Sequence, residues 1–512
     1  MFVNYRHASI EAHFSSGEGS GVSERGAGVL LHPTSLPGRF GIGDLGPEAI
    51  RFLDWLAEAG QTTWQMLPLG PTGLGDSPYV AESVFAGNPL LISPEALRDD
   101  GLVDDAVLGA APAFGEGPVD FDGVRRWKNA LLRAAWKRLQ AEPRSEFLGE
   151  LDAFRGSVPW LREWCEFAAL KLLHGGAAWT AWDPGLRDRD PFALAGAAPQ
   201  IRDEIAYQEF LQFLFERQWQ GLRREAHARG VRLFGDAPIY VAHDSADVWA
   251  GRPYFQLDES GQPRAVSGVP PDYFSKTGQL WGSPLYDWGR IEAEGFGWWI
   301  RRLRADLERV DLLRLDHFRG FDAYWSIPAG ARDASAGHWE PGPGARLFRA
   351  LRDGLGGLPI VAEDLGDITD DVRALRDSFG LPGMRVLQFG VGHPESEHHP
   401  SRVPERSFAY TGTHDNDTAV GWLASLDEEE RRRVLADLGS DGRELAWDLI
   451  AAAWGTQAEC AIVPVQDVLG LGSDARMNTP SVPEGNWRFR LRGPLASERG
   501  TRLRDLTRRT GR

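Results

Sequence analysis

The sequence has little cysteine, no long apolar run and an excess of negative charge. Its two cysteines, Cys165 and Cys460, form no CxxC pair, zinc-ligand spacing or disulfide framework, so we expect a reduced cytoplasmic setting. No apolar run is long enough to span a membrane, and residues 1–24 lack the apolar core of a signal peptide. The net charge of −17 disfavours nucleic acid and anionic membranes as partners, because both favour a basic face.

The composition is that of a large folded chain behind a polar leader. Residues 15–28 are rich in Gly, Ser and Glu, so residues 1–24 are expected to be a flexible leader and residues 25–512 the folded part. A length of 512 residues exceeds an average domain but fits one barrel with insertions. The 20 tryptophans are enough to serve both the core and flat platforms for sugar rings, which hints at a carbohydrate ligand.

Short apolar segments separated by helical patterns predict an α/β fold. The segments that read as strands are 29–33, 62–69, 231–240, 311–317, 359–363, 384–389, 408–413 and 461–466. Helical patterns lie between several of them, for example at 47–59, 369–379 and 427–438. Eight such strands predict a (β/α)8 TIM barrel, and a doubly wound open sheet is the alternative.

Two long intervals between the predicted strands indicate insertions. Helical periodicity predicts a mostly helical subdomain at 70–230, after the second strand, with helices at 122–140, 144–155, 158–175 and 200–229. A second insertion, at 241–300 after the third strand, contains an exposed loop at 268–279.

The fourth predicted strand ends in charged residues that a buried strand would not otherwise carry. Leu312, Leu313 and Leu315 form its apolar run, and desolvating the charges that follow is costly unless they pair or bind a ligand. At the carboxyl end of a barrel strand, Arg314 would hold Asp316 ionised, as a nucleophile requires. The alternative is that Asp316 caps the next helix, with Arg314 as its structural partner.

Acidic residues also follow the fifth and seventh predicted strands, at Glu363 and Asp415. Together with Asp316 they should face one mouth of the barrel. Glu363 and Asp364 could instead begin a helix, and residues 414–417 could form an Asx-rich turn or a metal cluster.

Two carboxylates across a glycosidic bond are the minimum for retaining glycosyl transfer. Asp316 suits the nucleophile. Glu363 suits the general acid, because the apolar strand before it and Asp364 beside it should both raise its pKa. Asp415 would stabilise positive charge in the transition state, with His414 bonding a sugar hydroxyl.

Motifs in a fixed order over residues 25–490 resemble the 4-alpha-glucanotransferase (amylomaltase) family of the alpha-amylase clan. They are HPTSLPG at 32–38, DSPY at 76–79, AGNP at 86–89, GD at 235–236, PPDYFSKTGQLWG at 270–282, RLDHFRG at 314–320, AEDLG at 362–366, PGM at 382–384, GTHDNDT at 412–418, RMN at 476–478 and GNW at 485–487. The chain departs from the family pattern at residues 80–83, Ser283 and residues 481–482, so the resemblance implies the chemistry but not the acceptor preference or product size.

The resemblance implies transfer of alpha-1,4-glucan segments from a donor maltooligosaccharide to the 4-hydroxyl of an acceptor glucan or glucose. Maltooligosaccharides and starch or glycogen chains would be donors and acceptors, and no cofactor or metal is needed. Asp316, Glu363 and Asp415 would be nucleophile, acid/base and stabiliser of a retaining double displacement through a covalent glycosyl-enzyme. The sugar subsites would be lined by Ser77, Tyr79, Asp236, Gln279, Trp281, Arg314, Phe389 and His414.

The loop at 268–279 is expected to cover the active site, with Tyr273 and Phe274 excluding water so that a sugar hydroxyl accepts the glycosyl group. The alternatives are an alpha-glucan hydrolase of the same clan, a catalytically silent glucan-binding barrel, and a metal hydrolase using His414, Asp415 and Asp417.

Overall fold

The centre of the molecule is an eight-stranded parallel sheet. The computed structural model describes residues 25–271 and 275–512. The strands follow the order β10-β11-β12-β1-β2-β3-β6-β9. Their bounds are β1 Gly26–Leu30, β2 Thr63–Gln65, β3 Arg232–Ala237, β6 Leu312–Leu315, β9 Ile360–Ala362, β10 Gly383–Val386, β11 Ser407–Tyr410 and β12 Cys460–Pro464. The predicted leader lies outside the described residues.

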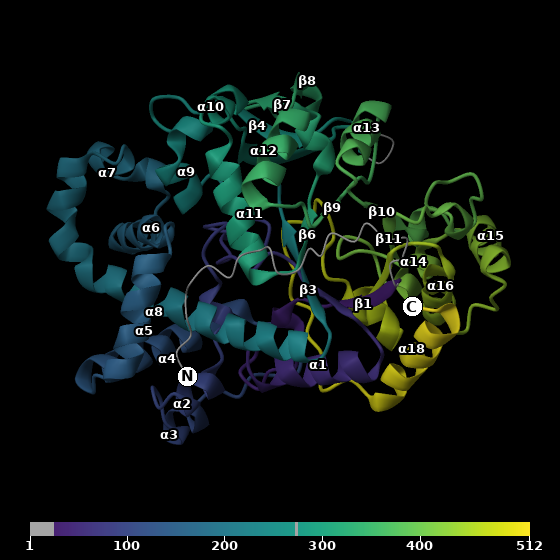
Figure 1. Cartoon of the computed structure of the whole chain (residues 1–512), viewed down its shortest axis with the longest axis horizontal. Helices are drawn as coiled ribbons and strands as arrows, with labels where there is room; N and C mark the ends of the chain where they lie inside the picture. Colours follow the sequence, from purple (N-terminus) through teal and green to yellow (C-terminus); the bar gives the residue numbers. More distant parts are fainter. Residues whose placement is uncertain (1–24, 272–274) are drawn as a thin grey trace.

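The two ends of this strand order meet. The backbone N–H of Ala362, the last residue of β9, donates to the carbonyl of Pro382, which precedes β10, at 2.9 Å. The sheet is therefore a nearly closed barrel (Figure 1). The predicted (β/α)8 barrel is confirmed, and the open doubly wound sheet is wrong.

Successive strand residues pack into two different cores. Leu30 and Ile462 belong to a cluster among the strands, whereas their neighbours Val29 and Val463 belong to the larger cluster formed with the helices. Alternate strand side chains point to opposite faces, so a strand buried on both faces reads as a continuous apolar run. This is why the strands could be found from the sequence.

The places of the strands along the chain were predicted correctly, but the residues at which they begin and end were predicted less accurately. β1 covers Gly26–Leu30 rather than 29–33, and Pro33–Ser35 form a 3-10 turn. Pro33 has no N–H to donate to a ladder, which ends the strand. Within β1, Gly28 lies so close to the neighbouring strand β2 that a Cβ at this position would be 2.4 Å from the carbonyl oxygen of Thr63.

Helices cover the outside of the barrel (Figure 1). Their bounds are α1 Pro47–Glu58, α11 Gly297–Arg309, α12 Ala345–Leu355, α13 Asp370–Ser378, α14 Ala419–Ser425, α15 Glu428–Leu438, α16 Leu445–Gly455, α17 Val465–Leu469 and α18 Ser497–Thr510. The last helix returns to the first, because the indole N–H of Trp55 in α1 donates to the carbonyl of Ala496 at 3.2 Å.

The chain between β2 and β3 is mostly helical and lies to one side of the barrel, at the left of Figure 1. Its helices are α2 Pro94–Asp99, α3 Asp105–Gly109, α4 Phe121–Ala141, α5 Ser145–Ser157, α6 Leu161–Leu173, α7 Pro184–Arg187 and α8 Pro191–Ala228. A helical insertion after the second strand is thus confirmed. The sequence predicted the last helix only from residue 200, but α8 continues through Pro199. The bounds 70–230 for an independent subdomain stay a prediction.

A second sheet, which the sequence analysis missed, stands at the top of Figure 1. It is antiparallel, in the order β5-β4-β7-β8, with β4 Ala265–Val269, β5 Gln279–Pro284, β7 Ala323–Pro328 and β8 His338–Pro341. The short helices α9 Ala246–Ala250 and α10 Trp288–Ala293 flank β4 and β5 in the chain. Describing 241–300 only as a loop insertion was therefore incomplete. Tyr273 and Phe274, the predicted covering residues of the loop, lie outside the described residues.

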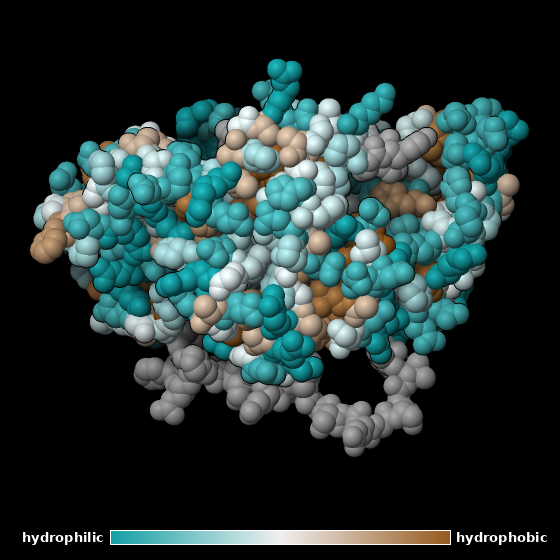
Figure 2. Space-filling model, turned by 90° about the horizontal axis from the view of Figure 1, so that it is seen from above, coloured by the Kyte–Doolittle hydropathy of each residue, from teal (hydrophilic) through white to brown (hydrophobic). Residues whose placement is uncertain are grey.

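The face drawn in Figure 2 is mainly hydrophilic, and apolar side chains show through in small, separate patches. Among residues 25–271 and 275–512, no helix combines the length and apolarity that crossing a bilayer requires.

Candidate active site

Three carboxylates follow three strands of the barrel at their carboxyl ends. Asp316 comes directly after β6, Glu363 directly after β9, and Asp415 follows β11 after a short turn. The carboxyl ends of parallel barrel strands open at one face. Backbone contacts bring the first two together, since the N–H of Phe318 donates to the carbonyl of Glu363 at 3.1 Å.

Arg314 bridges two buried or half-buried carboxylates. Its Nη1 lies 2.8 Å from Oδ2 of Asp236 and 2.7 Å from Oδ1 of Asp316. Asp236 and Arg314 are register partners on β3 and β6, which fixes this contact. Burial alone would lower the pKa of Arg314, but Asp236 and Asp316 together raise it well above its usual value. The guanidinium therefore stays charged beside Asp316.

Glu363 is held as a protonated acid at neutral pH. Burial raises its pKa from 4.5 to about 8; Arg314 opposes this shift and Asp316 adds to it. Its two carboxyl oxygens accept the N–H groups of His317 at 2.7 Å and Leu365 at 3.0 Å. His317 has φ 50 and ψ 51, a left-handed conformation that is unfavourable for a residue other than glycine.

Asp364, which the sequence led us to expect as a cause of the raised pKa of Glu363, is not among its main causes. Its carboxylate is occupied by β10, where it accepts the N–H of Met384 at 2.7 Å and pairs with Arg385 at 3.2 Å. Consecutive residues of an extended chain point to opposite sides. Burial and Asp316 supply the shift instead.

Tyr79 joins the chain after β2 to the mouth of the barrel. Its hydroxyl donates to Oδ2 of Asp236 at 2.7 Å, and its ring stacks on His414 with centroids 5.1 Å apart. Trp487 packs against His414 from 6.0 Å. Burial raises the pKa of Tyr79 well above its usual value, so its hydroxyl keeps its proton and remains a donor.

Asp415 is fixed by the segment that follows β12, in a way the sequence analysis missed. Oδ1 of Asp415 accepts the amide of Asn478 at 2.6 Å, and Oδ2 lies 3.3 Å from Nε2 of His414. Arg476 donates to the backbone carbonyl of Asp415 at 2.5 Å. The RMN motif at 476–478 was the available signal, but nothing in its spacing indicated which carboxylate it serves.

The second sheet brings an aromatic ring to the residue after Asp316. Trp281 on β5 meets His317 edge-on, with centroids 4.8 Å apart, and its side chain is 41% exposed. Gln279 accepts the indole N–H of Trp281 at 3.1 Å. An exposed ring held in this way could stack on a sugar.

The two remaining predicted subsite residues are Ser77 and Phe389. Ser77 accepts the backbone N–H of Tyr79 at 3.2 Å, so it shapes the turn that carries Tyr79. Phe389 ends the 3-10 turn Leu387–Phe389, is 49% exposed and has its ring against His398.

The metal-hydrolase alternative finds no support in this geometry. Oδ2 of Asp417 accepts the hydroxyl of Ser473 at 2.7 Å, and its Oδ1 accepts the N–H of Thr418 at 2.7 Å. Within the described part of the chain, no three His, Cys, Asp or Glu side chains group as metal ligands.

Comparison with known families identifies the activity of the site at this end of the barrel. The sequence model of the 4-alpha-glucanotransferase family matches residues 31–496. The chain belongs to this family. It is 47% identical over 477 residues to the 4-alpha-glucanotransferase of Synechocystis sp., covering 92% of this chain and 94% of the relative. It is 48% identical over 503 residues to that of Thermus thermophilus, covering 95% and 99%. The enzyme is a 4-alpha-glucanotransferase and transfers alpha-1,4-glucan segments.

One solved structure agrees with this assignment, and a second shows the same fold. The amylomaltase from Streptococcus agalactiae, in complex with acarbose, superposes with a TM-score of 0.92 at 37% identity, covering 95% of this chain and 99% of its own. The amylomaltase from Corynebacterium glutamicum shares the fold, with a TM-score of 0.77 at 18% identity, covering 94% and 75%. The resemblance inferred from the motifs is confirmed.

Proposed function

We propose that the enzyme transfers glucan segments by a retaining double displacement in which Asp316 is the nucleophile, Glu363 the acid/base and Asp415 the transition-state stabiliser. Donors and acceptors would be maltooligosaccharides and starch or glycogen chains. The observation that carries the proposal is the pairing of a buried Glu363, whose pKa is raised to about 8, with an adjacent Asp316 that is ion-paired to Arg314. One acid and one carboxylate are what the first step needs.

In the first step, a carboxylate oxygen of Asp316 bonds to the anomeric carbon of the donor. The bond from that carbon to the glycosidic oxygen breaks, and Glu363 gives its proton to the departing oxygen. The released sugar leaves, and the retained glucan segment is an ester of Asp316. Glu363 is now a carboxylate, stabilised by the N–H groups of His317 and Leu365.

In the second step, the 4-hydroxyl of an acceptor sugar attacks the same carbon. Glu363 takes the hydroxyl proton, the ester bond breaks, and Asp316 returns to its carboxylate form. Two inversions give net retention. Asp316 is then again a carboxylate and Glu363 again a protonated acid.

Asp415 would act when the anomeric centre carries positive charge. The amide of Asn478 holds one of its oxygens, at 2.6 Å, and the Asp415 side chain is still 44% exposed. Trp281, Tyr79 and His414 would line the neighbouring sugar positions, with Gln279, Phe389 and Ser77 further out.

The test is incubation with maltotriose, following glucose, longer maltooligosaccharides and total reducing ends. Transfer gives a ladder of products at constant reducing ends, and Asp316→Asn should lower the rate by at least about 10⁴-fold, in the range seen for removed nucleophiles. Rising reducing ends would replace transfer by the hydrolase alternative. Substantial activity in Asp316→Asn would refute the assigned nucleophile.

A further inference from the structure

The barrel has a seam between β9 and β10, directly beside Glu363. These strands are the two ends of the sheet order, and no ladder pairs them in the described chain. One backbone hydrogen bond, from Ala362 to Pro382, spans the gap. Backbone pairing therefore stops just before the residue proposed as the acid/base.

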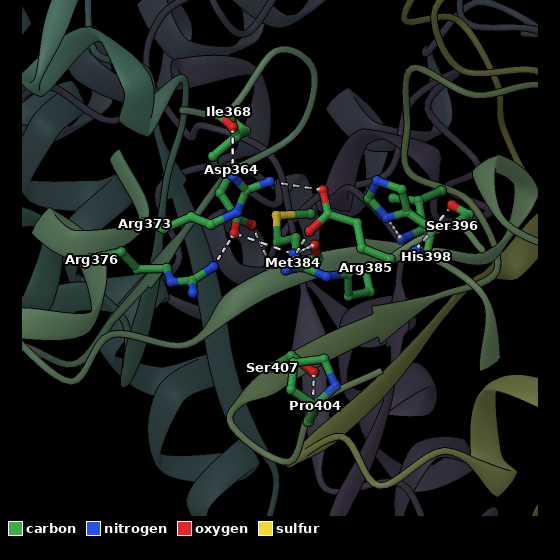
Figure 3. Close-up of polar contacts among 12 residues, drawn as sticks. Asp364, Ile368, Arg373, Arg376, Met384, Arg385, Ser396, His398, Pro404 and Ser407 are labelled. Carbon is green, nitrogen blue, oxygen red and sulfur yellow. Dashed lines mark hydrogen bonds and ion pairs between the residues drawn. The ribbon is translucent and has the colours of Figure 1, made fainter. Parts of the chain in front are cut away.

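Beyond that bond, the side chain of Asp364 closes the seam (Figure 3). Its Oδ1 accepts the backbone N–H of Met384 on β10 at 2.7 Å, in the place of a ladder bond. Its Oδ2 faces Arg385 at 3.2 Å and also pairs with Arg376 of α13. A Cβ on Gly383 would come within 2.5 Å of Oδ2, so only glycine leaves room for this carboxylate. Asp364 is 3% exposed, so its ion pairs are little screened by water and are stronger than surface pairs.

Arg385 also holds the loop after β10. Arg385 reaches Glu397 at 3.0 Å, and Glu397 also lies 3.6 Å from Arg373 of α13. His398 accepts the backbone N–H of Val386 at 3.2 Å. Figure 3 shows Arg373, Arg376 and Arg385 gathered around Asp364 and Met384. The seam is thus held by a network of charges rather than by backbone pairing.

Glu363 directly follows β9, the strand that has β6 on one side and the seam with β10 on the other. On one side its N–H donates to the carbonyl of Leu315, the last residue of β6, at 3.1 Å. On the other side, the next residue in the chain is anchored to β10 by its carboxylate. The place of Glu363 relative to Asp316 therefore depends on both anchors.

We propose that Asp364 is a positioning residue for Glu363. By closing the seam it holds the acid/base within proton-transfer reach of the glycosidic oxygen while Asp316 is at the anomeric carbon. The inference rests on the proposed role of Glu363 as acid/base. A group transferring a proton must lie within about 3 Å of its target, and a displacement of roughly 1 Å costs on the order of 10²-fold in rate.

The test compares two donors in Asp364→Asn. Maltotriose needs its leaving oxygen protonated. Maltotriosyl fluoride does not, and with azide as the acceptor the second step needs no base. The amide would turn an N–H₂ toward Arg376 and Arg385, which removes the charge pairs. Asp377→Asn is the matched control, because Asp377 shares Arg376 at 2.7 Å but its side chain is 60% exposed.

We expect Asp364→Asn to lower kcat on maltotriose by about 10- to 100-fold. Fluoride release with azide should fall by less than about 3-fold, because that reaction bypasses the proton transfers that displacement of Glu363 would slow. Asp377→Asn should leave both rates within about 2-fold of the parent, as for an exposed ion pair. An equal fall with both donors, or no fall with maltotriose, would overturn the proposal.

Two further variants keep the result decisive. If Asp364→Asn does not fold, Arg385→Gln should give the same split between donors. It keeps the hydrogen bond from the Met384 N–H to Asp364 but removes the ion pairs of Arg385 with Asp364 and Glu397 and its hydrogen bond to the Met384 carbonyl. The absence of a split in a folded Arg385→Gln overturns the proposal. Glu363→Ala tests the underlying role. If maltotriosyl fluoride with azide does not restore the activity of Glu363→Ala, the acid/base assignment fails. If activity is restored but Asp364→Asn slows both donors equally, only the positioning role fails.

Discussion

Replacing Glu363 by glutamine should make the protein increasingly more stable than the parent as the pH rises. The folded pKa of about 8 lies above the ordinary value of 4.5, so the native state binds this proton more tightly than the unfolded chain. The stability linked to that proton is fully present below about pH 4.5 and is lost as the pH rises to about 8. Glutamine has no proton to lose, so its variant escapes this penalty.

The magnitude follows from the size of the shift. One pKa unit corresponds to about 1.4 kcal/mol, so the full interval from 4.5 to about 8 corresponds to about 5 kcal/mol of relative stabilisation. The amide also carries a cost that does not depend on pH. Both oxygens of Glu363 accept N–H groups, and an amide nitrogen facing one of them loses about 1–3 kcal/mol.

The readout is therefore the change with pH, not the absolute difference. We would measure guanidinium denaturation by tryptophan fluorescence at pH 5, 7 and 9, for the parent and Glu363→Gln. Glu428→Gln, whose side chain is 79% exposed, is the control and should follow the parent. A stability difference that stays constant from pH 5 to 9 would refute the reasoning about the buried acid.

Three further predictions concern activity. The rate of maltotriose disproportionation should fall as the pH rises through about 8, where Glu363 loses the proton it must donate, and a rate that holds well above that pH would contradict its role. Asn478→Ala removes the 2.6 Å hydrogen bond to Asp415, so kcat should fall by about 10- to 100-fold, in keeping with 1.5–3 kcal/mol for a bond to a charged group; an unchanged kcat would mean that Asp415 needs no orientation. Trp281→Ala should raise the KM for maltotriose by about 10-fold, the equivalent of about 1.4 kcal/mol of lost sugar contact, with less effect on kcat. Steady-state kinetics measure both constants, and a fall in kcat with an unchanged KM would contradict this role.

The barrel was predictable from the sequence because its strands are buried on both faces. Leu312, Leu313 and Leu315 form an apolar run whose end, Asp316, is charged, and the same pattern marks Glu363. The position of the proposed catalytic carboxylates at the strand ends could therefore be predicted from the sequence. Their charge environment was only half predictable, since the contact of Arg314 with Asp316 is local but its contact with Asp236 crosses to another strand.

What the sequence could not supply are contacts between distant segments. The strand Gln279–Pro284 is half exposed and carries no alternating pattern, and its sheet takes strands from two different connections of the barrel. Asp415 and its partner Asn478 are 63 residues apart, and Asp364 and Arg385 are 21 apart. No local periodicity encodes such pairs, because they depend on how the barrel closes.

The proposed double displacement requires a covalent intermediate at Asp316, and trapping it is the most direct test. Maltotriosyl fluoride should glycosylate Glu363→Gln without acid catalysis, and the missing base should let the adduct accumulate. We expect mass spectrometry to show one maltotriosyl group per chain, on the peptide that contains Asp316, and no adduct when Asp316→Asn is added. An adduct on another residue, or a product of inverted configuration without any adduct, would contradict the double displacement.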